Sequence, residues 1–96
     1  MYAKVIRPWN FNEIIDAIKF IMEERNVVSI AVDTFSFDNL HSPEYEVHYA
    51  WLGNERWGIE VVNNLDDVPA VGATSVVGQP KIQGGTGGPN RVMALV

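Results

Sequence analysis

The residues best suited to chemistry are a histidine and a glutamate twelve positions apart, His48 and Glu60. Glu60 is the only acid in the apolar run from Trp57 to Val62. Its carboxylate must face solvent or meet a partner, because burying an unpaired charge is costly. Imidazole and carboxylate together suit Zn²⁺ or Mn²⁺, although ordinary sites use three or four protein ligands. A lone helical histidine is more often structural or solvated, so that interpretation stays open beside the metal hypothesis.

Three further residues are candidates for contact with a small ligand. Asp33 ends an apolar run, the place where loops of α/β proteins carry functional groups. The alternative is that its carboxylate only caps the following turn. Trp51 and Trp57 could line a pocket, although tryptophan more often fills a core or a dimer interface. His41 precedes the expected start of a helix and need not share a face with His48. The chain has no cysteine, which excludes thiolate ligands and disulfides.

The elements that would position these residues follow from the apolar pattern. Apolar residues at helical spacing predict a helix from Asn10 to about Arg25, and the β-branched run 27–32 predicts a strand buried on both faces. Ser42-Pro43-Glu44 has the residue types of a helix start, which predicts a second helix to about Leu52. Further strands are expected at 1–8, 57–62, 73–78 and 91–96. About five strands and two helices in this order favour an α/β fold, with α+β as the alternative.

Composition excludes several classes of protein. Ninety-six residues, 47% of them hydrophobic and 20% charged, fit one globular domain over 1–96. A net charge of −5 disfavours binding to nucleic acid, which needs a clustered basic face. No apolar run is long enough for a signal peptide or a membrane-spanning helix. We therefore expect a cytoplasmic protein with neither membrane nor nucleic acid as a partner.

Five segments, taken in order, resemble the C-terminal half of the cyclase family of metal-dependent amidohydrolases, which includes kynurenine formamidase and isatin hydrolase. The nearest likeness is to the isatin hydrolase-like branch. It covers residues 11–96, whereas residues 1–10 do not match. The segments that carry the resemblance are Val32-Asp33-Thr34, His48-Tyr49-Ala50-Trp51-Leu52, Arg56-Trp57-Gly58-Ile59-Glu60, Asn64-Leu65-Asp66-Asp67-Val68-Pro69 and Pro80–Arg91.

The resemblance implies half of a swivelling β/β/α domain and a tendency to form dimers or higher oligomers. It also implies a role for two residues. His48 and Glu60 fall on positions that help to bind the second metal of a two-metal site in kynurenine formamidases of the family.

Two departures from the family pattern limit what is implied. The family's principal metal site and catalytic histidine come from a His-x-Gly-Thr-His-x-Asp-x-Pro-x-His stretch, and the 96 residues contain no such stretch. In addition, Val61 stands where the isatin hydrolase-like branch usually has Asn.

Two hypotheses follow. In the first, the chain is a truncated cyclase-like domain, not catalytic alone, which acts as a homo-oligomeric binding or assembly module without a cofactor. In that case His48 and Glu60 are vestigial or partial ligands. In the alternative, the chain is a subunit of an amidohydrolase that cleaves a C–N bond of an amide or cyclic amide. A second chain would then supply the missing ligands, and Zn²⁺ or Mn²⁺ would be the cofactor.

Overall fold

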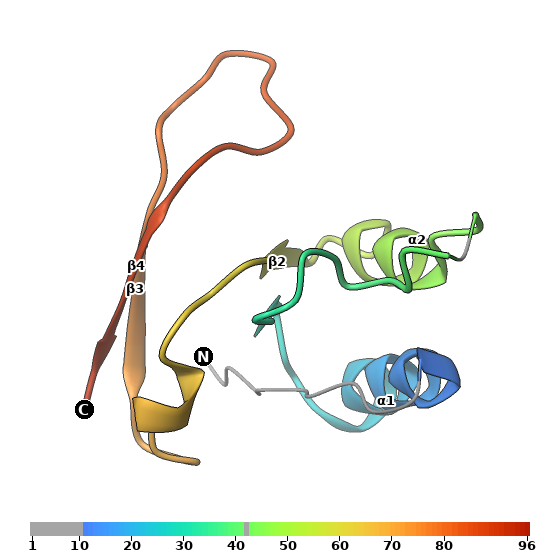
Figure 1. Ribbon diagram of the computed structural model, residues 1–96, viewed down its shortest axis with the longest axis horizontal. Coiled ribbons are helices and arrows are strands. Elements are labelled where there is room, and N and C mark those ends of the chain that lie inside the picture. Colours follow the sequence, from blue (N-terminus) through green and yellow to red (C-terminus); the bar gives the residue numbers. More distant parts are fainter. Residues whose placement is uncertain (1–10, 42) are drawn as a thin grey trace. The chain divides into compact units, whose positions relative to one another are not determined.

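The computed structural model describes residues 11–41 and 43–96. The chain divides into two compact units, Met1–Leu65 and Asp66–Val96, and each is described by itself. The elements appear in Figure 1, and their bounds in chain order are α1 (Phe11–Glu24), β1 (Ser29–Ala31), α2 (Glu46–Leu52), β2 (Trp57–Ile59), the 3-10 helix η1 (Leu65–Asp67), β3 (Thr74–Gly78) and β4 (Arg91–Leu95).

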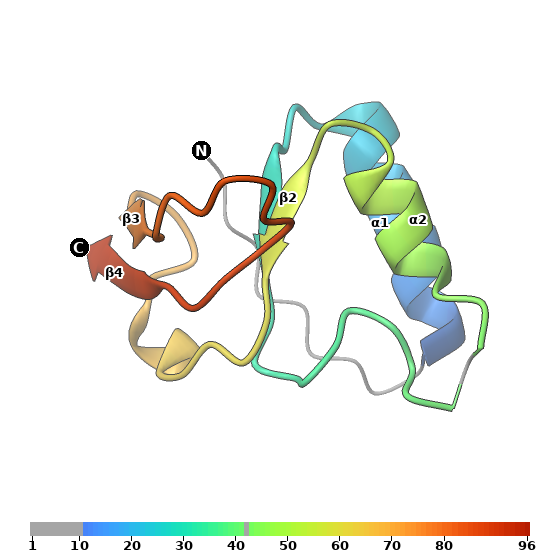
Figure 2. The same ribbon diagram turned by 90° about the horizontal axis from the view of Figure 1, so that it is seen from above.

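The first unit is a β-α-β arrangement preceded by a helix. Strands β1 and β2 are parallel, with Ser29 opposite Trp57 and Ala31 opposite Ile59. Parallel strands need a crossover connection, and here the crossover contains α2. Both helices lie on the same side of the two-stranded sheet and pack against each other (Figure 2).

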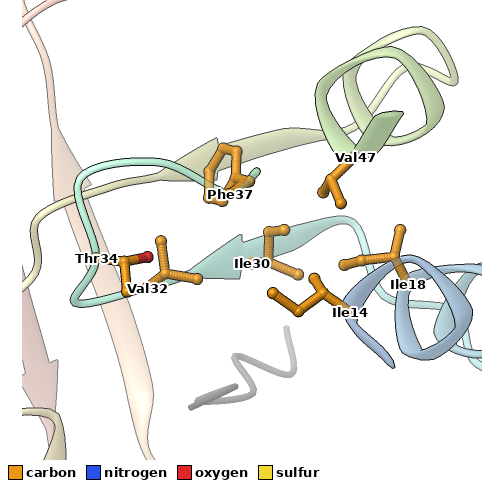
Figure 3. Close-up of a pocket in the computed structure, with 7 residues that line it drawn as sticks. All are labelled: Ile14, Ile18, Ile30, Val32, Thr34, Phe37 and Val47. Carbon is orange, nitrogen blue, oxygen red and sulfur yellow. The ribbon is translucent and has the colours of Figure 1, made fainter. Parts of the chain in front are cut away.

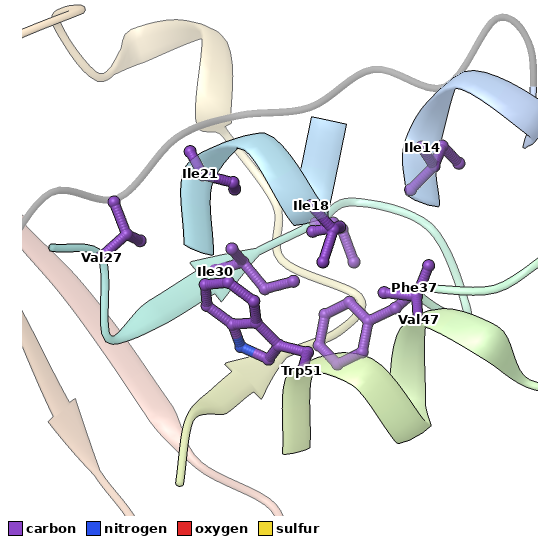
Figure 4. Packing of buried hydrophobic residues seen from close by; sticks show 9 residues of the cluster. Ile14, Ile18, Ile21, Val27, Ile30, Phe37, Val47 and Trp51 are labelled. Carbon is purple, nitrogen blue, oxygen red and sulfur yellow. The ribbon is translucent and has the colours of Figure 1, made fainter. Parts of the chain in front are cut away.

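The core of this unit lies between the two helices and β1. Trp51, Ile18 and Ile30 are the largest fully buried side chains, and Figure 4 shows them packed together with Phe37 and Val47. The Trp51 indole Nε1 donates a hydrogen bond of 2.7 Å to the Trp57 carbonyl. The polar end of the buried indole is thereby satisfied, as buried tryptophans usually require.

A small apolar hollow remains beside this core (Figure 3). Among its described lining residues Thr34 is the one polar residue, and the Thr34 hydroxyl already donates to the Ser36 carbonyl at 2.8 Å. The described lining therefore offers no charged group to a metal or a polar ligand. Its lining residues are Ile14, Ile18, Ile30, Val32, Thr34, Phe37 and Val47.

The second unit is built on an antiparallel pair of strands. Strands β3 and β4 pair from Thr74 opposite Leu95 to Gly78 opposite Arg91. The glycine-rich segment lies in the exposed connection between them, where Gly84 has a φ of 72°. Val76 and Met93 form a cross-strand pair and are 40% and 47% exposed. The hairpin therefore carries apolar side chains on a face that the described residues leave open.

The α/β class expected from the sequence is confirmed. The predicted helix over 10–25 is observed as α1, and each predicted strand after residue 26 contains an observed one. The predicted strand at 1–8 and the predicted cap Ser42 lie outside the described residues. Within residues 11–41 and 43–96, no helix is both long and apolar enough to cross a membrane.

The predicted start of the second helix was wrong. Helix α2 begins at Glu46, and Pro43 and Glu44 lie in a turn before it. Tyr45 precedes the helix in the left-handed conformation, with φ 47° and ψ 46°. A continuous helix through this residue is therefore excluded, because left-handed backbone cannot belong to a right-handed helix.

Val61, which directly follows Glu60, has a φ of 58°. A β-branched residue in this region is strained, at a cost of about 1–3 kcal/mol. Two backbone hydrogen bonds hold the segment in place: Val61 N–H donates to Thr34 C=O at 3.0 Å, and Val62 N–H donates to Val32 C=O at 2.9 Å. The resemblance places Asn at this position in the related branch, and Asn tolerates left-handed backbone.

We predict that Val61→Asn stabilises the protein by about 1 kcal/mol, because it removes this strain. Val61 is 60% exposed, so the substitution removes little packing. Urea unfolding measures the change, and Val62→Asn is the matched control at a neighbouring valine without positive φ. A Val61→Asn variant that is no more stable than the wild type would contradict the prediction.

Candidate functional site

The candidate site lies at the carboxyl ends of the two parallel strands. Glu60 directly follows β2, and Asp38 lies in the loop that follows β1. His48 lies in the first turn of α2, which begins after the same loop. Open α/β sheets bind ligands at this edge, because the connecting loops and the helix starts converge there.

Asp38 caps helix α2 from outside the helix. Its Oδ1 accepts a hydrogen bond of 2.7 Å from Val47 N–H, and its Oδ2 accepts one of 3.0 Å from His48 N–H. Tyr45, at the N-cap position, makes no side-chain capping bond. The first N–H groups of a helix have no partner within it, so the distant carboxylate takes the place of a local capping residue.

The same carboxylate contacts the His48 ring. His48 Nδ1 lies 2.6 Å from Asp38 Oδ2, and His48 Nε2 lies 3.4 Å from Glu60 Oε1. Glu60 Oε1 also accepts a hydrogen bond of 3.1 Å from Phe37 N–H. The imidazole therefore stands between two carboxylates, with a short contact on one side and a longer one on the other.

Two aromatic rings flank the imidazole. The Phe37 ring centroid lies 5.3 Å from that of His48, and the Tyr45 ring lies edge-on at 6.1 Å. Phe37 can occupy its place because Gly58 has no side chain: a Cβ at that position would overlap the Phe37 ring. A glycine inside a strand commonly marks such a close approach.

Burial and charge differ between the three polar residues. The Asp38 side chain is 5% exposed, whereas those of His48 and Glu60 are 31% and 32% exposed. Burial alone would raise the pKa of the Asp38 carboxyl. The hydrogen bonds from Val47 N–H, the His48 ring and His48 N–H, together with the charge of His48, outweigh burial and hold that pKa below its usual value. Asp38 is therefore an internal anion, while the side chains of His48 and Glu60 are partly open to solvent.

The spacing of His48 and Glu60 fits two ligands of one metal ion. Ligand bonds of about 2.1 Å at tetrahedral angles place two donor atoms about 3.4 Å apart, which is the observed Nε2–Oε1 distance. Asp38 would then be the outer carboxylate that metal-binding histidines commonly contact through their other nitrogen. Within the described ranges there is no group of three or more metal-ligating side chains that could hold an ion. The arrangement thus supplies two ligands.

The structure places the other sequence-predicted residues elsewhere. Trp51 is fully buried in the core, and Trp57 is 36% exposed on β2. Asp33 and His41 are exposed, and neither side chain forms a hydrogen bond within the described part of the chain; only the backbone N–H of His41 donates, to Asn39 Oδ1 at 2.9 Å. The structure therefore brings together His48 and Glu60 but adds none of these four residues to them. That His48 and Glu60 bind a metal stays a prediction.

Sequence reasoning missed Asp38. The segment from Phe35 to Leu40 shows no apolar periodicity and has the pattern of a loop. No local signal points to Asp38, because the two N–H groups that it accepts from, those of Val47 and His48, lie nine and ten positions further along the chain.

Comparison with known proteins supports the fold. No protein-family model matches the chain, and no curated protein matches it either. Among solved structures, the chain is similar to isatin hydrolase A from Labrenzia aggregata, determined with benzyl benzoate bound. The two are 38% identical with a TM-score of 0.76, over 83% of this chain and 33% of that chain. The fold is therefore isatin hydrolase-like, and the chain spans about a third of the length of the hydrolase.

The lowered pKa of Asp38 predicts how stability responds to acid. A carboxyl whose pKa is lower in the folded state contributes stability above its usual pKa of 3.8, and that contribution is lost as pH falls through the folded value. We therefore expect Asp38→Asn to have a lower free energy of unfolding than the wild type at pH 7, and we expect this difference to become smaller below about pH 4. Urea unfolding at a series of pH values measures the difference. Asp33→Asn, at an exposed carboxylate, is the control. A difference in unfolding free energy for Asp38→Asn that does not change with pH would contradict the lowered pKa of Asp38.

Proposed function

We propose that this chain is one part of a metal-dependent amidohydrolase of the cyclase family and is not catalytic alone. In this proposal His48 Nε2 and Glu60 Oε1 are two ligands of a divalent cation. The remaining ligands and the proton carrier come from another polypeptide segment. The observation that carries the proposal is the 3.4 Å approach of these two atoms, with a buried carboxylate behind the imidazole.

The protein's own residues have distinct roles in this account. His48 and Glu60 hold the cation from the carboxyl edge of the sheet, and Asp38 orients the imidazole. If bound there, Zn²⁺ or Mn²⁺ would supply Lewis-acid chemistry for hydrolysis, an activated water and a polarised carbonyl. Two protein ligands leave most of the coordination to water, so the isolated chain should bind a cation weakly and hydrolyse amides poorly. The chain spans 33% of the similar hydrolase, which agrees with a site whose remaining ligands come from further polypeptide.

The substrate class follows from the similar protein's name and from the surroundings of His48. Isatin is a flat aromatic cyclic amide. Of the two rings that flank the imidazole, Phe37 is buried in the core, whereas Tyr45 is exposed and can be reached by a ligand. Aromatic side chains favour stacked or edge-on contacts with flat rings. We propose an aromatic or cyclic amide as the substrate of the completed site, with hydrolysis of a C–N bond as the reaction.

Titration with Zn²⁺ or Mn²⁺ tests the two-ligand site. The melting temperature should rise with cation, because a ligand of the folded state stabilises it by about 1.4 kcal/mol at ten times its dissociation constant. His48→Ala and Glu60→Ala should each abolish the rise, and native mass spectrometry should show one cation lost. His41→Ala, which removes the other histidine, should keep both signals. A wild type that shows no cation response, or a response that depends on His41, would contradict the proposal.

A second candidate is a metal-free assembly module, and the second unit favours it. Strands β3 and β4 form a two-stranded sheet within the described residues, and such hairpins are marginally stable alone. The exposed cross-strand pair Val76 and Met93, with the exposed Leu95, forms an apolar face. We propose a second copy of this chain as the partner, because identical hairpins can pair edge to edge and cover identical apolar faces.

Charged substitutions on this face test the assembly. Val76→Lys and Met93→Lys should convert the oligomer to monomer in sedimentation velocity, because each places a charge in the buried contact. Ala94→Lys is the matched control, since Ala94 is exposed on the opposite side of the same strand. A wild type that is monomeric, or an oligomer that survives both substitutions, would rule out this partner surface.

A further inference from the structure

We infer that Asp38 is a positioning residue that sets the tautomer of His48 and so decides which ring nitrogen offers its lone pair to the Glu60 side. This deepens the proposed function and rests on it only where a cation is concerned. The tautomer itself is a property of the metal-free chain. The evidence is the placement of one buried carboxylate against three donors.

The contact between Asp38 and the His48 ring has a defined hydrogen-bond polarity. An ionised carboxylate only accepts hydrogen bonds, whereas a neutral imidazole has one donor nitrogen and one acceptor nitrogen. The 2.6 Å contact between Asp38 Oδ2 and His48 Nδ1 therefore places the proton on Nδ1. When the ring is neutral, Nε2 is then the acceptor nitrogen, with its lone pair directed away from Asp38.

The other ring nitrogen of His48, Nε2, faces the Glu60 carboxylate. Its nearest acidic oxygen is Glu60 Oε1, at 3.4 Å, which exceeds the usual 2.7–3.2 Å of an N–H···O hydrogen bond. In the neutral ring, Nε2 and the Glu60 carboxylate are two lone-pair donors that face each other, and they attract only with a positive charge between them, either a proton on Nε2 or a bound cation. In the proposed function a divalent cation supplies that charge, and the exposure of both side chains leaves it a path from solvent.

The helix start holds the Asp38 carboxylate in place. Val47 N–H and His48 N–H at the start of α2 both donate to it. A rotation of the Asp38 side chain away from the imidazole would leave these two N–H groups without their acceptor, which costs free energy where they are buried. The helix start and the imidazole orientation are therefore coupled through a single side chain.

Asp38→Asn separates these two roles. An asparagine oxygen at the Oδ1 position can still accept from Val47 N–H, whereas the amide nitrogen at the Oδ2 position cannot accept from His48 N–H, so only part of the cap is kept. Its amide nitrogen, however, donates to His48 Nδ1, where the aspartate oxygen accepted. The His48 proton should then move to Nε2, which removes the lone pair from the Glu60 side.

NMR of the metal-free protein, with histidine labelled at both ring nitrogens, reads the tautomer directly. At about pH 8.5, where a model imidazole is neutral, the two-bond nitrogen–proton correlations of His48 should show Nδ1–H in the wild type and Nε2–H in Asp38→Asn. His41, whose ring makes no hydrogen bond to a described residue, is the internal reference and should not change. Nε2–H at His48 in the wild type would overturn the inference, and so would a tautomer unchanged in Asp38→Asn. The wild-type spectrum decides the matter if the variant does not fold.

A parallel Zn²⁺ titration separates this inference from the proposed function. Loss of the outer carboxylate typically lowers metal affinity about 10- to 100-fold, and Asp38→Asn should fall in that range. Nδ1–H in the wild type without any cation binding would refute the proposed function and leave the positioning role intact. Cation binding by a wild type with Nε2–H would refute the positioning role of Asp38 and leave the proposed function intact.

Discussion

The buried carboxylate of Asp38 is the contact on which the site depends. It satisfies two N–H groups at the start of α2 and contacts the His48 ring at 2.6 Å. Helix α2 has seven residues and no local cap, so its first turn needs an acceptor from elsewhere. Asp38 thus both caps the helix and orients the imidazole, so a substitution at this position changes both contacts.

A second constraint comes from the parallel strands, which place Glu60 beside this imidazole. The β1–β2 register brings the end of β2 to the loop that contains Phe37 and Asp38. Phe37 N–H then donates to Glu60 Oε1, and the Phe37 ring lies where a side chain at position 58 would stand. The loop therefore positions both carboxylates: Asp38 is part of the loop, and Glu60 accepts a hydrogen bond from the loop backbone at Phe37. Val61, next to Glu60, has a positive φ, which is unfavourable for valine. Such a conformation persists only where the surrounding structure holds it in place.

Local patterns predicted the elements and two of the three site residues. The apolar spacing of α1 and the β-branched run around β1 are strong local signals, and both elements formed where expected. Glu60 was conspicuous because it is an acid within an apolar run. Asp38 carried no such signal, because its role is a tertiary contact with backbone N–H groups about ten residues away. The typical helix start at residues 42–44 was misleading for the same reason, since the distant carboxylate replaces a local cap and the helix begins later.

A crystal of this protein soaked in Zn²⁺, measured at the zinc absorption edge, tests the central claim most directly. The account predicts an anomalous peak within bonding distance of both His48 Nε2 and Glu60 Oε1, with the Asp38 contact to Nδ1 retained. A peak at His41 alone, or His48 hydrogen-bonded directly to Glu60 with no metal at saturating Zn²⁺, would contradict it.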